Sequence, residues 1–177
     1  MELTPLMQRF VLNWGEMGAR WGVNRTIAQI HALLYLAPRP INAEEIAGAL
    51  GVARSHVSNS LRELQGWRLA RTVHVLGDRR DHFECVKDVW EMFHTILDER
   101  KRREVDPTLR MLRECVQDVA GSAGGDPEVA ERLRRLLDFF ETASGWYELV
   151  RTMPLEELVR MAPPEWNKEE SKEDKKG

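Results

Sequence analysis

The sequence of 177 residues has only two cysteines, Cys85 and Cys115, no long apolar run and no excess of positive charge. Two cysteines cannot build a disulfide scaffold, so we expect a protein of the reducing cytoplasm. The longest apolar run, Ala32 to Ala37, is far shorter than the ~20 residues of a membrane helix. The first residues, Met1 to Pro5, provide neither a basic segment nor an apolar one, so no secretory signal is expected.

Acidic and basic residues nearly cancel, because 26 Lys and Arg stand against 29 Asp and Glu and leave a formal charge of −3. This balance provides no global attraction to nucleic acid, so any such function must depend on local charge. Apolar residues make up 42% of the chain, which indicates a folded core. The sequence has no nucleophile motif, phosphate-binding loop or metal-ligand spacing. We therefore predict that the protein is not an enzyme and has no cofactor and no metal site.

Apolar residues at steps of three and four predict helices over most of the chain. One stripe covers residues 3–21, and the longest covers residues 127–150. A helix over about 88–106 should end or kink before Pro107, because proline lacks the N–H that a helix interior needs. Residues 163–177 are mostly charged and are predicted to form a disordered tail. The apolar stripes over 3–21 and 127–150 are too long to be fully buried against the short segment between them.

Residues 42–66 have the pattern of two short helices joined by a tight turn. Asn42 is a good N-cap for the first helix, and Gly51 suits the left-handed turn that follows. In the second helix Val57, Leu61 and Leu64 face inward, which is the pattern of a helix-turn-helix. The residues left facing outward are polar or basic: Arg54, Ser55, His56, Ser58, Asn59 and Arg62. We predict that they contact DNA, because short polar side chains can reach base edges and arginines can hold phosphates.

Positive charge gathers in the same part of the chain. Residues 53–82 contain six arginines against three acidic residues, a net charge of +3 in a chain of −3. Residues 70–76 and 82–86 are predicted strands, with Gly77 to Arg80 as the turn between them. Arg79 and Arg80 would then touch the DNA backbone or the minor groove. An ordinary solvated helix face is the alternative interpretation of this segment.

One stretch of the sequence is Ile46-Ala47-x-x-Leu50-Gly51-Val52-x-Arg54-Ser55-x-Val57-Ser58-x-x-Leu61-Arg62-x-Leu64. This pattern resembles the helix-turn-helix of MarR-type transcriptional regulators. The wing Gly77-Asp78-Arg79-Arg80-Asp81-His82-Phe83, followed by Lys87-Asp88-Val89-Trp90, looks like the GbsR-like branch of that family. The specific match covers about residues 42–97. Two residues depart from the family pattern. Ala53 replaces the usual Ser or Thr N-cap, and Arg68 replaces the glycine that usually follows the recognition helix.

The resemblance implies a mainly α fold, a winged helix-turn-helix with a two-stranded β wing and N- and C-terminal dimerisation helices. The expected segments are an N-terminal dimerisation helix (1–24), the DNA-binding domain (25–87), a C-terminal helical dimerisation region (88–162) and the charged tail (163–177). It also implies a cytoplasmic homodimeric repressor that reads a palindromic operator with the helix over 54–65. The residues expected at the dimer interface are Phe10, Trp14, Leu133, Leu136, Phe140 and Tyr147.

Three points stay open. MarR-type proteins often bind a small effector, and Trp14, Trp21, Trp90 and Phe93 would suit a quaternary ammonium through cation–π attraction, although Trp14 and Trp21 also suit a core. The two cysteines are interpreted as buried structural residues, with redox sensing as the alternative. A winged-helix module that binds proteins, without sequence-specific DNA binding, is the alternative function.

Overall fold

The computed structural model describes residues 2–121, 126–153 and 155–161. The chain forms two compact units, Met1–Arg100 and Lys101–Gly177, and each is described by itself. This division is coarser than the four segments predicted above, which stay a prediction. Within the described ranges no helix is both long and apolar enough to cross a membrane.

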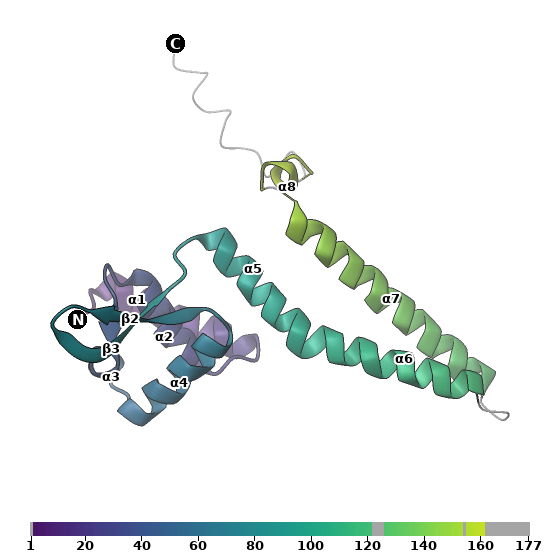
Figure 1. The fold of residues 1–177 in the computed structure, drawn as a ribbon, viewed down its shortest axis with the longest axis horizontal. Coiled ribbons are helices and arrows are strands. Elements are labelled where there is room, and N and C mark those ends of the chain that lie inside the picture. Colours follow the sequence, from purple (N-terminus) through teal and green to yellow (C-terminus); the bar gives the residue numbers. More distant parts are fainter. Residues whose placement is uncertain (1, 122–125, 154, 162–177) are drawn as a thin grey trace, which may run out of the picture. The chain divides into compact units, whose positions relative to one another are not determined.

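The first unit is a winged helix-turn-helix (Figure 1). Its three strands form an antiparallel sheet in the order β1-β3-β2, with Ile41 opposite Phe83 and Thr72 opposite the same residue from the other side. The elements in chain order are α1 (Pro5–Arg20), α2 (Arg25–Leu36), β1 (Ile41–Asn42), α3 (Ala43–Leu50), α4 (Arg54–Gly66), β2 (Ala70–Val75), β3 (Asp78–Cys85) and α5 (Val89–Arg100).

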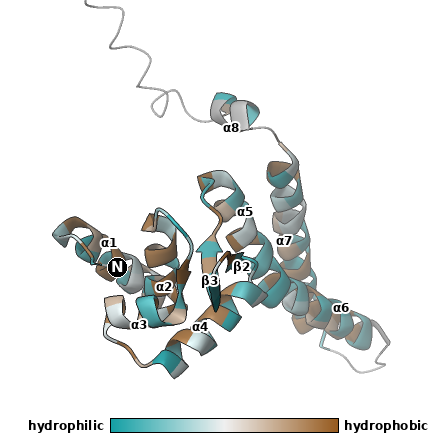
Figure 2. Ribbon diagram, turned by 60° about the vertical axis from the view of Figure 1, so that its left-hand side comes forward, coloured by the Kyte–Doolittle hydropathy of each residue, from teal (hydrophilic) through white to brown (hydrophobic). Residues whose placement is uncertain are grey.

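Helix α2 lies at the centre of the core of this unit. Its Ile30, Leu33 and Leu34 are at most 1% exposed, and α1, α3 and α4 contact it or each other around them. Hydrophobic residues dominate α2 in Figure 2. Helix α1 approaches α2 closely through Gly18, where a Cβ atom would lie 2.5 Å from the Cβ of Ala28. Any side chain at this position would therefore push the two helices apart.

The helix-turn-helix forms as its sequence indicates. The side chain of Asn42 accepts a hydrogen bond from the N–H of Glu45, and the Glu45 carboxylate accepts one from the N–H of Asn42, which makes a capping box for α3. Gly51 then turns the chain in the left-handed conformation, with φ of 65°.

The predicted turn of the wing, Gly77 to Arg80, is wrong by its last three residues. Strand β3 already begins at Asp78, which pairs with Val75, so only Leu76 and Gly77 connect the strands. Gly77, the second residue of the turn, has φ of 85°, a conformation that glycine adopts at little cost. Asp78, Arg79 and Arg80 therefore stand on a strand, where side chains alternate between its two faces.

The second unit is a helical hairpin. A π-helical segment η1 (Lys101–Val105) is followed by α6 (Asp106–Gly121), α7 (Pro127–Thr152) and the short α8 (Leu155–Met161). The break predicted before Pro107 is present, because the π-helical segment η1 precedes it and α6 begins at Asp106. Proline is tolerated in the first turn of a helix, where its missing N–H removes no hydrogen bond. Leu109, Leu112 and Ala130 form the buried seam. The predicted charged tail lies outside the described residues.

Candidate nucleic-acid interface

Helix α4 presents a polar face to solvent. Its first turn has no side-chain cap, because Ala53 at the N-cap position offers no hydrogen-bond acceptor. Val57, Ser60, Leu61 and Leu64 are buried. The residues predicted to contact DNA from this helix are exposed, apart from the half-buried Ser58: Arg54, Ser55, His56, Asn59 and Arg62.

Two arginines of this face have partners within the chain. Arg54 Nη2 lies 2.9 Å from Glu44 Oε1 on α3, and Arg62 Nη1 donates a hydrogen bond of 3.1 Å to Asn59 Oδ1. The role of Glu44 was missed from the sequence, because it stands on a different helix and no spacing links the two positions. The side chains of Arg54 and Glu44 are 69% and 41% exposed, so the pair is open to exchange with another anion.

The wing contains a second pair of this kind. Arg80 Nε donates to both oxygens of Asp78, at 2.9 and 3.1 Å, and the main-chain N–H of Arg80 donates to Oδ1 at 3.0 Å. These hydrogen bonds hold the pKa of Asp78 well below its ordinary value and raise the pKa of Arg80. Buried His82 lies beneath, with Nε2 3.5 Å from Asp78 Oδ2. The signal for this contact was present, since residues two apart on a strand share a face.

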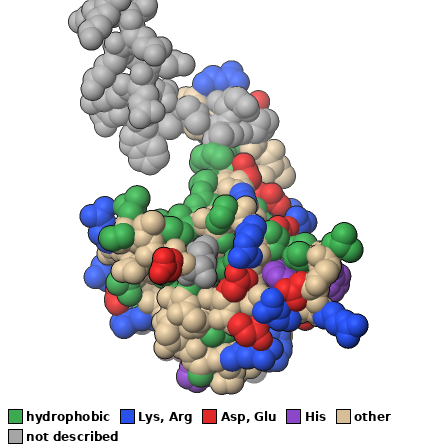
Figure 3. Space-filling view, turned by 90° about the vertical axis from the view of Figure 1, so that its left-hand side faces the viewer, with side chains coloured by type: hydrophobic (Ala, Val, Ile, Leu, Met, Phe, Trp, Pro, Cys, Tyr) green, Lys and Arg blue, Asp and Glu red, His purple; other side chains and the backbone are tan. Residues whose placement is uncertain are grey.

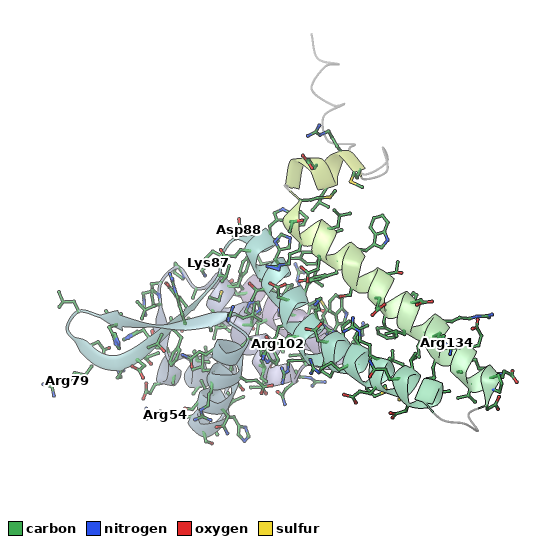
Figure 4. The ribbon with its side chains drawn as sticks, turned by 45° about the vertical axis from the view of Figure 1, so that its right-hand side comes forward. Arg54, Arg79, Lys87, Asp88, Arg102 and Arg134 are labelled. Carbon is green, nitrogen blue, oxygen red and sulfur yellow. The ribbon has the colours of Figure 1, made fainter. Side chains whose placement is uncertain are left out.

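Arg79, in contrast, has no ion pair or side-chain hydrogen bond among the described residues. It projects from the end of the hairpin, away from the core, while Arg54 projects from the start of α4 (Figure 4). Elsewhere basic and acidic side chains lie intermingled on the face seen in Figure 3. Arg79 is therefore the wing cation that is most available to an external anion.

The lead-in to the wing explains one departure from the family pattern. Arg68 has φ of 59°, the left-handed conformation in which glycine is favoured, and it is the only residue other than glycine with positive φ among those described. The main chain makes the turn nevertheless, with hydrogen bonds from Arg68 N to Gln65 O and from Leu69 N to Leu64 O. The arginine thus occupies the glycine conformation at some cost in strain.

Lys87 and Asp88 join the wing to α5. Lys87 Nζ donates to the carbonyl oxygens of Leu34 and Tyr35 at 2.6 Å and of Ala37 at 2.9 Å, which satisfies the C-terminal end of α2. Asp88 Oδ1 accepts a hydrogen bond of 2.7 Å from the N–H of Glu91 and caps α5. Both residues lie where the chain enters α5 (Figure 4). This junction holds the start of α5 against α2.

The four aromatic residues predicted for an effector do not form one cluster, and Trp14 and Trp21 have no ring contact with each other among the described residues. Trp90 and Phe93 meet edge to face at 5.9 Å and are each 42% exposed. Trp14 is half-buried and stacks on Phe10 at 5.4 Å, while the ring of Trp21 carries the guanidinium of Arg100 at 5.4 Å. No ring contact among the described residues joins Trp90 or Phe93 to Trp14 or Trp21. The effector site stays a prediction.

The two cysteines differ in burial, and only Cys85 has the buried setting that was predicted for both. Cys85 is buried, and burial raises the pKa of its thiol above the ordinary value, while Cys115 is half-buried and both are free. Among the described residues no cluster of His, Cys, Asp and Glu is arranged to hold a metal ion.

Helix α7 has two apolar faces. Ala130, Leu133, Phe140 and Tyr147 are buried or half-buried in the chain's own packing. Five other apolar side chains are between 45% and 64% exposed: Val129, Leu136, Phe139, Trp146 and Leu149. Three of them, Leu136, Phe139 and Trp146, lie on one side of the helix and form an exposed row. Of the residues predicted for dimerisation, Leu136 belongs to this exposed row, whereas Phe10 and Trp14 pack partly against the core of the first unit.

Comparison with known proteins finds similar sequences and a similar fold. Residues 21–81 match the model of the MarR family. The chain is 21% identical over 150 residues to the HTH-type transcriptional repressor OpcR of Bacillus subtilis, covering 81% of each. It is 21% identical over 175 residues to YvaV of the same organism, covering 92% of this chain and 99% of YvaV. A crystal structure of a transcriptional regulator shares the fold, with a TM-score of 0.66 and 21% identity over 83% of this chain and 96% of that chain. The predicted fold is thereby confirmed.

Proposed function

Residues 21–81 carry the winged helix-turn-helix of the MarR family of transcriptional regulators, and on that premise we propose that the chain binds double-stranded DNA as a homodimeric, cytoplasmic repressor. The family is one of regulators and not of enzymes, in agreement with the prediction made from the sequence. The exposed polar face of α4, flanked by the free Arg79 of the wing, is the observation that supports DNA binding. A helix of this kind fits the major groove, and a wing arginine can reach a neighbouring phosphate or the minor groove.

The residues of the interface divide into two roles. Ser55, His56, Ser58 and Asn59 are short or planar polar side chains that can reach base edges. Arg54, Arg62, Arg79 and Arg80 contact phosphates, which fix the position of the protein but carry no sequence information. The overall charge of −3 keeps non-specific attraction low, so binding depends on this one face.

We assign the dimer contact to the exposed row of α7. Its Leu136, Phe139 and Trp146 lie on one side of the helix, and a second copy of the same helix offers the same row in return. A dimer can present two α4 helices about 34 Å apart, one turn of DNA. The wing motif resembles the GbsR-like branch. By that resemblance, a quaternary-ammonium effector would release the DNA by favouring a spacing of the two α4 helices that no longer fits one turn of the duplex.

The decisive experiment is selection of bound duplexes from a random pool by the full chain, with binding to the winner then measured at several salt concentrations. Recovery of an inverted repeat with salt-sensitive binding supports the proposal. No enrichment over the starting pool contradicts it and favours the protein-binding alternative.

The dimer is tested separately by the double variant F139E/W146E. Its mass in solution should be that of one subunit, with unchanged helix content by circular dichroism, whereas the wild type should have the mass of two. A wild-type protein that is a single subunit at micromolar concentration contradicts the homodimer.

A further inference from the structure

A cavity of about 240 Å³ lies between the first turn of α2 and the middle of α4. Two of its lining residues, His56 and Asn59, belong to the exposed face of α4 described above, so the cavity opens beside the candidate DNA-reading surface. The complete lining is Asn24, Thr26, Ile27, His56, Asn59, Ser60 and Glu63. Neither the sequence motifs nor the family resemblance singles out the α2 side of this cavity.

The first turn of α2 leaves donors unused at this point. The side chain of Asn24 accepts a hydrogen bond of 2.9 Å from the N–H of Thr26, and the carbonyl of Asn24 accepts one from the N–H of Ala28. No described group accepts a hydrogen bond from the N–H of Ile27. The first turn also has no acidic residue, so its positive end is not neutralised there.

Ser60 provides an independent sign of a ligand. It is only 7% exposed, yet its hydroxyl has no hydrogen-bond partner among the described residues. Solvent still reaches this hydroxyl, because the fully enclosed side-chain atoms without a partner among the described residues are Nε2 of His31 and Nε2 of His94. Because Ser60 lines the cavity, its hydroxyl is open to a ligand there, beside the hydroxyl of Thr26 and the end of α2.

We propose that the cavity receives one phosphate of the duplex backbone while α4 occupies the adjacent major groove. The N–H of Ile27 and the hydroxyls of Thr26 and Ser60 donate to the phosphate oxygens, and the positive end of α2 favours their charge. Glu63 is the one carboxylate of the lining, and it opposes the phosphate. This inference rests on the proposed function and adds a second helix to the DNA contact.

Two variants test the site on the selected duplex. S60A removes one neutral donor, so affinity should fall roughly three- to tenfold while the salt slope stays unchanged, because a hydroxyl releases no counterion. E63Q removes the opposing charge on an exposed position, so affinity should rise, and more so at low salt. Thermal melting of both variants tests whether they are folded. If S60A does not fold, the affinity of E63Q alone tests the site.

Duplexes with a single uncharged methylphosphonate linkage locate the phosphate. At one linkage in each half-site the wild type should lose affinity, and S60A should lose less affinity there than the wild type does, because only the donors of Thr26 and Ile27 remain to be lost. Equal affinities of wild type, S60A and E63Q for a duplex that is bound with normal salt sensitivity would overturn this inference and leave the proposed function intact. Failure of the wild type to bind any duplex overturns both.

Discussion

Arg79 and Arg80 are neighbours in the sequence, but the structure predicts different effects when each is replaced by alanine. Arg79 has no partner among the described residues, whereas Asp78 already neutralises Arg80. A cation that neutralises a phosphate contributes about 0.9 to the slope of log affinity against log salt concentration. A dimer of R79A loses two such contacts, so its slope should be smaller by about 1.8.

This difference is large enough to measure. Between 50 and 200 mM salt, a slope change of about 1.8 alters the ratio of the two affinities about 12-fold. The change for R80A should be well under half of that, because Arg80 gains a phosphate only by giving up Asp78. D78N should do the opposite and steepen the slope, because it leaves Arg80 without its anionic partner.

Fluorescence anisotropy of a labelled duplex at five salt concentrations measures these slopes for the wild type and the three variants. The isolated hairpin position of Arg79 makes it a clean substitution, since no described side chain loses a partner. The reasoning is refuted if R80A flattens the slope as much as R79A does, or if neither variant differs from the wild type.

Three further predictions concern stability, measured as the free energy of unfolding in urea. Burial, helped by the charge of Lys87, lowers the pKa of His31 from 6.5 to about 4. The unfolded chain therefore binds this proton at a higher pH than the folded chain does, so the free energy of unfolding should fall by about 3 kcal/mol between pH 6.5 and pH 4 and then level off. The variant H31L should lack this pH dependence. K87M should lose about 1–3 kcal/mol, because three carbonyls at the end of α2 lose their donor, with K87R restoring part of it. R68G should gain about 0.5–1 kcal/mol by relieving the positive φ, whereas R68A, which keeps a Cβ there, should stay near the wild type.

The parts of the fold that could be predicted are those set by local chemistry. The capping box of Asn42, the left-handed turn at Gly51 and the burial of Val57, Leu61 and Leu64 all follow from residue type and spacing, and the structure has each of them. The wing turn was misplaced because Asp78 and the arginines after it are polar enough for a turn, and only pairing with Val75 across the hairpin makes them a strand.

The parts that could not be predicted depend on contacts between distant segments. Lys87 reaches carbonyls that lie about fifty positions earlier in the chain, and Glu44 meets Arg54 across a turn between helices. The apolar stripe of α7 was correctly seen as continuous. The sequence alone could not divide it into a face used within the chain and an exposed face, because the residues of both faces are apolar and interleave along the helix.

Variants of the carboxylates beside Arg54 and Arg80 allow overall affinity for DNA and preference for the operator to be measured separately. A phosphate contact contributes equally to binding of every duplex. The cost of breaking the ion pair of Arg54 with Glu44, or of Arg80 with Asp78, therefore lowers the affinity for the operator and for a scrambled duplex by the same factor. A base contact acts only on the operator. E44Q should therefore tighten binding to both duplexes equally and leave their ratio unchanged, whereas S55A should weaken only the operator complex and reduce the ratio. If E44Q changes the ratio instead, Arg54 reads a base, and its place among the phosphate contacts is wrong.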